Sequence, residues 1–173
     1  MSPNAHDVPP MPSTTAPLVA LMADQVQGLA RAGISSAVTV NGMLSLPERH
    51  DALEKVRMGD AAMLLISPEQ LRSPSIRTVL QQREVGLWVL DEAHCISKWG
   101  HDFRPEYLQL STLHELYPNV PRIALTATAD MATQNEMLAR LGLTEARVFL
   151  SSFDRPNIRY TIVEKDDPKK QLL

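Results

Sequence analysis

The feature that most constrains the fold of this sequence is an apolar run that ends in two adjacent carboxylates. Residues 85–90 read VGLWVL, and Asp91 and Glu92 follow at once. A continuous apolar run of this length is typical of a buried parallel strand, here one that would deliver its terminal acids to a nucleotide site. Asp91 can hold Mg²⁺ through its water shell, and Glu92 can orient or deprotonate a water that attacks a phosphoryl group.

The same two acids have a second interpretation. Carboxylates at the start of a helix satisfy free backbone N–H groups without any catalysis, so Asp91 and Glu92 could simply cap the next helix. The tetrapeptide Asp-Glu-Ala-His leaves both interpretations open, because a short motif needs its structural context.

The rest of the chain indicates the fold class. From Pro17 onward, short apolar runs alternate with amphipathic stretches, which predicts βαβ units and an α/β fold with a parallel sheet. Gly33 and Gly142 are placed to close two of the helices, and Ser67-Pro68 is suited to begin another. We expect strands at 37–40, 62–66, 85–90, 123–125 and 148–150, and helices at 18–29, 47–58, 106–117 and 131–141. Residues 158–163 alternate between apolar and polar side chains.

Composition bounds the class of protein. The 173 residues suit one domain, and the formal charge of −3 gives no global sign of a nucleic-acid partner, so such contacts would come from local patches. Cys95 is the single cysteine and no run approaches the length of a membrane span, which predicts a soluble cytoplasmic protein with no membrane partner, associated with the nucleoid if bacterial. Residues 1–16 are proline-rich and are expected to form a disordered leader, not a signal peptide.

A loop rich in aromatic and basic side chains follows the acids. Trp99, His101, Phe103 and Arg104 are the types of residue that stack on exposed bases and bind phosphates. The alternative is structural: Trp99 and Phe103 could enter the core while Arg104 pairs with Asp102.

Two hydroxyl side chains, Thr126 and Thr128, come just after the strand expected at 123–125. If that strand ends beside the one carrying the acids, these hydroxyls can hydrogen-bond to His94 and form a relay that senses the occupant of the acid pair. Either threonine could instead cap the helix that begins near Met131.

Five segments together resemble a known family. They are PLVALMADQ (17–25), LLISPEQL (64–71), DEAHCISKWGHDFRPEY (91–107), ALTATAD (124–130) and SSFDRPNIRY (151–160). In order and spacing they resemble the first motor domain of RecQ-type superfamily 2 DNA helicases. The resemblance covers residues 17–173 and implies a RecA-like domain of the P-loop NTPase type. Such a domain uses ATP and Mg²⁺ as cofactors and binds single-stranded or partially duplex DNA.

The resemblance also implies roles for matching residues. Asp91 would be the Mg²⁺ ligand and Glu92 would position the water that hydrolyses ATP. His94, with Thr126 and Thr128, would couple the nucleotide state to movement between two RecA-like domains. The expected contacts to single-stranded DNA are Trp99, His101, Phe103 and Arg104.

Several departures from the family pattern alter these expectations. Ala23 and Lys98 stand where the family often has Lys and Gln, and the sequence contains no Gly-Lys pair, so it lacks the phosphate-binding loop of a P-loop motor. We therefore expect an N-terminally truncated RecA-like domain at 17–150, a connector toward a second domain at 151–173, and an unpaired strand edge. Such a chain would be inactive alone and would need the missing motor segments in cis or in trans.

Two other functions stay open from the sequence. The chain could be a non-catalytic remnant that binds DNA or a partner protein through the loop at 99–104 and the exposed sheet edge. A metal-dependent hydrolase using His94 with Asp91 and Glu92 is weaker, because the other histidines are not spaced as a ligand cluster.

Overall fold

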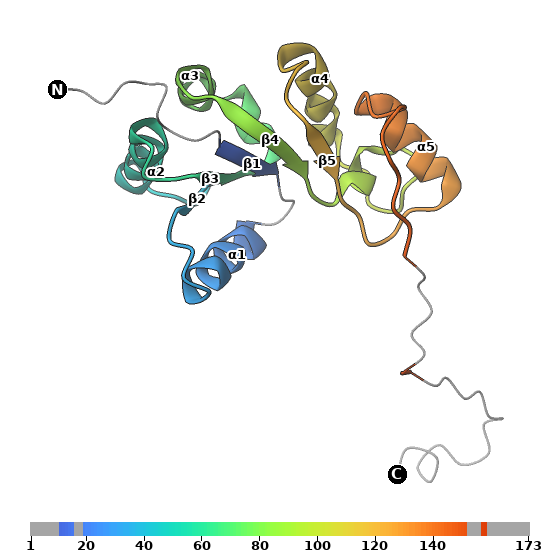
Figure 1. Ribbon diagram of the computed structural model, residues 1–173, viewed down its shortest axis with the longest axis horizontal. Coiled ribbons are helices and arrows are strands. Elements are labelled where there is room, and N and C mark those ends of the chain that lie inside the picture. Colours follow the sequence, from blue (N-terminus) through green and yellow to red (C-terminus); the bar gives the residue numbers. More distant parts are fainter. Residues whose placement is uncertain (1–10, 16–18, 152–156, 159–173) are drawn as a thin grey trace, which may run out of the picture.

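A five-stranded parallel sheet forms the centre of the molecule (Figure 1). The computed structural model describes residues 11–15, 19–151, 157 and 158. The sheet has the order β2-β3-β1-β4-β5 and every pair of neighbours is parallel. Its strands are β1 (Met11–Thr15), β2 (Ala37–Val40), β3 (Met63–Ile66), β4 (Val85–Leu90) and β5 (Arg122–Ala124). The α/β class with a parallel sheet is therefore confirmed.

Strand β1 corrects the expectation of a disordered leader over residues 1–16. Ser13 stands opposite Leu64 on β3 and opposite Trp88 on β4, so residues 11–15 form the middle strand of the sheet. Proline content indicated disorder, but a strand between two neighbours gains backbone hydrogen bonds on both sides whatever its side chains are. Pro12 has no N–H to donate, and the register with β4 shifts between Met11 and Pro12. Residues 1–10 lie outside the described part of the chain.

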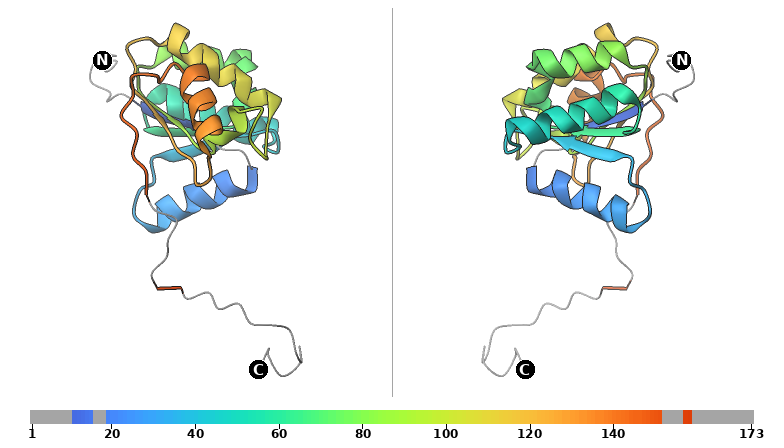
Figure 2. Two further views of the ribbon diagram at one scale, coloured as in Figure 1. Left: turned by 90° about the vertical axis from the view of Figure 1, so that its right-hand side faces the viewer. Right: turned by 90° about the vertical axis from the view of Figure 1, so that its left-hand side faces the viewer.

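Helices cover both faces of the sheet. Helix α1 lies on one face, while α2, α3 and α4 lie on the other, and α5 lies beyond β5 (Figure 1; Figure 2). The α-helices are α1 (Val19–Arg31), α2 (Leu46–Met58), α3 (Pro74–Gln82), α4 (Leu113–Leu116) and α5 (Met131–Arg140). Three 3₁₀ segments are η1 (Pro68–Arg72), η2 (Ala93–Ile96) and η3 (Pro105–Thr112).

The expected helices agree with the structure except in three places. The stretch 106–117 is helical but is divided between η3 and α4, and the segment after Ser67 is the 3₁₀ turn η1, in which Ser67 makes no side-chain cap bond. Helix α3 was not anticipated from the sequence. The strand expected at 148–150 is wrong: these residues are exposed and irregular, because no neighbouring strand among the described residues pairs with them. The alternating stretch 158–163 lies almost wholly outside the described residues.

Alternation along β3 divides the core between the two faces. Leu64 and Ile66 are fully buried in the larger cluster, under α2, α3 and α4, whereas Leu65 packs with Met22 of α1 in a smaller cluster. Trp88 of β4 belongs to the larger cluster, and its ring centroid lies 5.3 Å from that of Tyr117. Of the described helices, none is long and apolar enough to cross a membrane.

Candidate nucleotide-coupling and DNA-contact site

The two acids lie at the carboxyl end of β4, and neither caps a helix. Glu92 has left-handed backbone angles (φ 48°, ψ 41°) and precedes η2, but its side chain makes no cap bond. Its Oε2 instead lies 3.3 Å from Nδ1 of His94. The Oδ1 of Asp91 accepts a hydrogen bond of 2.9 Å from the backbone N–H of Glu92. The helix-cap interpretation of this acid pair is therefore wrong.

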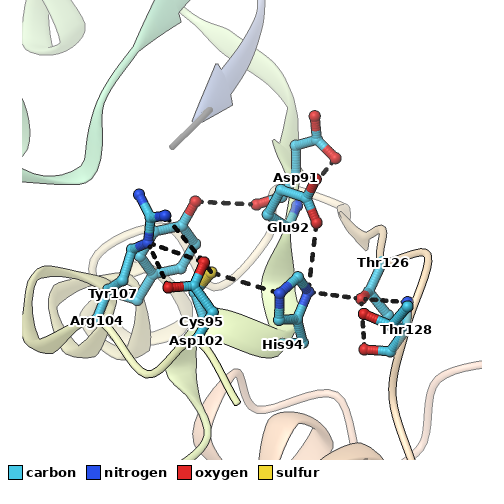
Figure 3. A network of polar contacts seen from close by, with 9 residues as sticks. All are labelled: Asp91, Glu92, His94, Cys95, Asp102, Arg104, Tyr107, Thr126 and Thr128. Atoms are coloured by element: carbon cyan, nitrogen blue, oxygen red, sulfur yellow. Dashed lines mark hydrogen bonds and ion pairs between the residues drawn. The ribbon is translucent and has the colours of Figure 1, made fainter. Parts of the chain in front are cut away.

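His94 joins the ends of two neighbouring strands (Figure 3). The ring is buried, and Nδ1 lies 2.8 Å from Oγ1 of Thr126, which follows β5. Oγ1 of Thr126 in turn accepts from the backbone N–H of Thr128 at 3.3 Å. Asp130, whose carboxylate accepts from the N–H of Thr133 at 2.8 Å, is the residue that caps α5. The structure thus brings Thr126 to His94 as expected, while Thr128 contributes its backbone.

The loop at 97–104 presents only part of its expected set to solvent. Trp99 is 77% exposed, so it does not enter the core. His101 is exposed and its ring stacks on that of His94, with centroids 5.4 Å apart and planes 13° from parallel. Phe103 is half-buried. Arg104 pairs with Asp102 at 2.9 Å, as the structural alternative proposed, and this hydrogen-bonded guanidinium holds the pKa of the Asp102 carboxyl below its usual value.

A glutamate on α5 fixes the start of this loop. Glu136 Oε2 accepts from Oγ of Ser97 at 2.6 Å and from the backbone N–H of Lys98 at 3.0 Å, while its Oε1 accepts from Arg140 at 2.6 Å. The hydrogen bond from Ser97 is the main cause of the lowered pKa of Glu136. Sequence reasoning missed this residue, since nothing near position 136 indicates a partner 39 residues away in the chain.

Two further residues around the acids were also missed. The Cys95 thiol is buried between His94 and Asp102, and burial raises its pKa to about 11. The Tyr107 hydroxyl donates to the backbone carbonyl of Asp91 at 3.3 Å, and burial raises the pKa of Tyr107. Both residues lie within the segment that resembles the helicase family, which is the one sequence signal that could have drawn attention to them.

The surroundings of Asp91 fit a metal ion better than they fit a nucleotide. Carboxylate oxygens are the ligands that Mg²⁺ prefers, and Asp91 offers them at a half-exposed strand end. Asp91 also borders a cavity of about 420 Å³ beneath the sheet, beside α1. Among the described residues that line this cavity, Asp91 is the only charged one, and the others are apolar apart from Gln25. A triphosphate would therefore find no basic group there.

Comparison with known proteins assigns this architecture to a family. The family model for DEAD/DEAH box helicases matches residues 10–137. The chain belongs to the DEAD/DEAH box helicase family.

Among its members, the chain is similar to the RecQ type. It is 46% identical over 156 residues to the ATP-dependent DNA helicase RecQ of Pasteurella multocida, a match that covers 90% of this chain and 24% of the relative. It is 45% identical to the RecQ of Haemophilus influenzae, with 90% and 25% covered, and 40% identical to a probable ATP-dependent DNA helicase RecS of Bacillus subtilis, with 90% and 31% covered. The chain thus spans about a quarter to a third of the length of these relatives.

A solved structure supports the fold. The helicase domain of Hef from Pyrococcus furiosus superposes with a TM-score of 0.56 at 18% identity, covering 80% of this chain and 29% of that one. The RecA-like α/β fold inferred from the sequence motifs is confirmed.

Proposed function

We propose that this chain is part of an ATP-dependent 3′-to-5′ DNA helicase of RecQ type, which couples ATP hydrolysis to DNA unwinding in recombination and repair. The observation that carries the proposal is the bond of 2.8 Å between His94 and Thr126. It links the strand that ends in the acids to the segment after β5, and His94 also lies beside Glu92 and beneath His101. One buried side chain therefore contacts both the acid pair and the loop proposed to bind DNA.

Within this proposal each part of the site has one task. Asp91 would hold Mg²⁺, which would supply charge neutralisation for the phosphates of ATP, and Glu92 would orient the attacking water. His94 and Thr126 transmit the state of that site toward a second RecA-like domain. The exposed indole of Trp99 stacks on an unpaired base, with His101, Phe103 and Arg104 beside it.

The 173-residue polypeptide by itself is proposed to be inactive in ATP hydrolysis and unwinding. Its sequence has no Gly-Lys pair for the phosphates, and the cavity beside Asp91 offers no basic lining residue among those described. Within the described part of the chain β5 pairs only with β4, so its outer edge is open to a further strand. We propose that other motor segments, in cis or in trans, supply the phosphate loop.

The DNA contact can be tested with a matched pair of variants. Trp99 and Phe149 are both 77% exposed aromatic residues, but only Trp99 belongs to the loop beside His94. Loss of one base-stacking contact costs about 1–3 kcal/mol, so Trp99→Ala should weaken binding of labelled single-stranded DNA by about 5-fold to 150-fold. Phe149→Ala should leave binding unchanged. If both variants weaken DNA binding equally, or if neither weakens it, the proposal that this loop contacts DNA is refuted.

A second candidate is a non-catalytic protein that binds DNA or a partner through the same loop. The observation that favours it is the combination of an exposed Trp99 with an open β5 edge. ATP hydrolysis and DNA binding, measured with and without a segment that carries the phosphate loop, distinguish the two candidates. The helicase proposal expects ATP hydrolysis once a segment carrying the phosphate loop is supplied, whereas the second candidate expects DNA binding with no response to ATP.

A further inference from the structure

Three side chains of different ligand type converge behind the acid pair. Sγ of Cys95 lies 3.7 Å from Nε2 of His94 and 3.6 Å from Oδ2 of Asp102. One ligand atom from each residue lies within 4.8 Å of the other two. Adjacent ligands of a tetrahedral zinc ion, at bond lengths of about 2.0–2.3 Å, stand roughly 3.3–3.8 Å apart, so the two measured separations already match a metal site.

We propose that His94, Cys95 and Asp102 bind a transition-metal cation of intermediate softness, such as Zn²⁺, with water as the fourth ligand. The nitrogen–sulfur–oxygen donor set suits Zn²⁺ and not Mg²⁺, which prefers oxygen ligands alone. The site is separate from the Mg²⁺ proposed at Asp91, and this inference does not depend on the proposed helicase function because metal binding is measured directly.

The environment of His94 supports a metal-binding orientation. Nδ1 is held by Thr126 at 2.8 Å and lies 3.3 Å from Glu92, which leaves the opposite nitrogen, Nε2, directed at the thiol. Hydroxyl and carboxylate partners on the far nitrogen are what orient metal-binding histidines and make them better ligands. Among the described residues, His94 gathers with Cys95 and Asp102 and not with both Asp91 and Glu92, because Nε2 is directed at Cys95 and only Nδ1 lies near Glu92.

Burial and charge also fit the proposal. His94 and Cys95 are buried, while the Asp102 side chain is 42% exposed and so offers a route for the ion from solvent. On binding, the Sγ–H bond of Cys95 breaks, a metal–sulfur bond forms and the proton leaves to water. The thiolate and the Asp102 carboxylate then balance the two positive charges. Arg104 donates to both oxygens of Asp102, to Oδ2 at 2.9 Å and to Oδ1 at 3.3 Å, so metal binding would replace the bond to Oδ2 and leave the bond to Oδ1.

Cobalt provides a test with a spectroscopic readout. The full chain, kept reduced, is titrated with Co²⁺, and a thiolate-to-cobalt charge-transfer band in the near ultraviolet is expected to saturate at one equivalent and to disappear when Zn²⁺ is added. Cys95→Ser should abolish the band. Asp102→Asn should keep the band but weaken binding at least about tenfold. His50→Asn, which changes an exposed histidine on α2, should change nothing.

Two further measurements separate the folded site from chance binding. Zn²⁺ should raise the Tm of the wild-type chain, and this rise should be absent in Cys95→Ser provided that circular dichroism shows the variant to be folded. In urea the band should vanish, since the fold brings Asp102 to the other two ligands. The proposal is overturned if the band is absent, if it persists in urea, or if Asp102→Asn binds Co²⁺ as tightly as the wild type.

Discussion

The contact between Ser97 and Glu136 should be one of the strongest polar interactions that hold the loop carrying Trp99. The Ser97 hydroxyl is fully buried and donates at 2.6 Å to a carboxylate that is 16% exposed. A hydrogen bond to a charged acceptor contributes about 1.5–3 kcal/mol. A double-mutant cycle of Ser97→Ala and Glu136→Gln, measured by urea unfolding, should therefore give a coupling free energy in that range.

The cycle has a matched control and a pH dependence. Arg140→Gln removes a partner of Glu136 that lies outside the loop, and loss of this partly exposed ion pair should cost about 0–1 kcal/mol. Because the folded-state pKa of Glu136 is lowered from 4.5, its contribution is complete above that pH and is lost as pH falls through the lower folded-state value. A coupling below about 0.5 kcal/mol near pH 7, or one that grows on acidification, would refute this account.

Three further predictions concern other parts of the fold. Gly142→Ala should destabilise the chain by about 1–3 kcal/mol in thermal unfolding, because φ is 62° and the new Cβ would stand 2.9 Å from His114. Ser45→Ala removes the capping box with Glu48 and should cost about 1 kcal/mol in the same assay, whereas Ser45→Gly should cost only a few tenths. Cys95, buried and with a pKa of about 11, should react with a thiol reagent at pH 8 at least about a hundredfold more slowly in the native chain than in urea; equal rates would contradict its burial.

The features that the sequence predicted correctly depend mainly on residues close together in the chain. The acids at 91 and 92 follow an apolar run whose length and composition indicate a buried strand, and β4 ends at Leu90 as expected. The partnership of His94 with Thr126 followed from the assumption that β4 and β5 are neighbours, which the register of Leu90 with Ala124 confirms.

What the sequence did not predict depends on distant partners. Residues 11–15 were assigned to a leader because proline is common in disordered segments, yet pairing with β3 and β4 places them in the centre of the sheet. Residues 148–150 were assigned to a strand because they are apolar, yet no strand in the described part of the chain pairs with them. Amino-acid composition indicates only the tendency of a segment to form a strand. Whether the strand forms depends on a neighbouring strand that can pair with the segment.

The exposure of single side chains in the loop at 97–104 was equally hard to predict from the sequence. Aromatic residues in a loop suit the core and a nucleic-acid contact equally well, so their exposure could not be decided from residue types. The structure divides the two aromatic residues, because Trp99 is exposed and Phe103 is half-buried. Glu136, which lies on a later helix, holds the start of this loop through Ser97 and the backbone of Lys98.

The polypeptide after β5 therefore contacts the site at two places. Thr126 binds His94 directly after the strand, and Glu136, one helix later, binds the start of the loop at Ser97. Asp130 caps α5 between these two contacts and so fixes the direction in which the helix leaves the strand. A displacement of β5 relative to β4 would thus shift the partner of His94 and the support of Trp99 together. In the proposed motor, a strand added at the open edge of β5 would act on both contacts at once, which gives a mechanical reason for the acids and the DNA loop to respond as one unit.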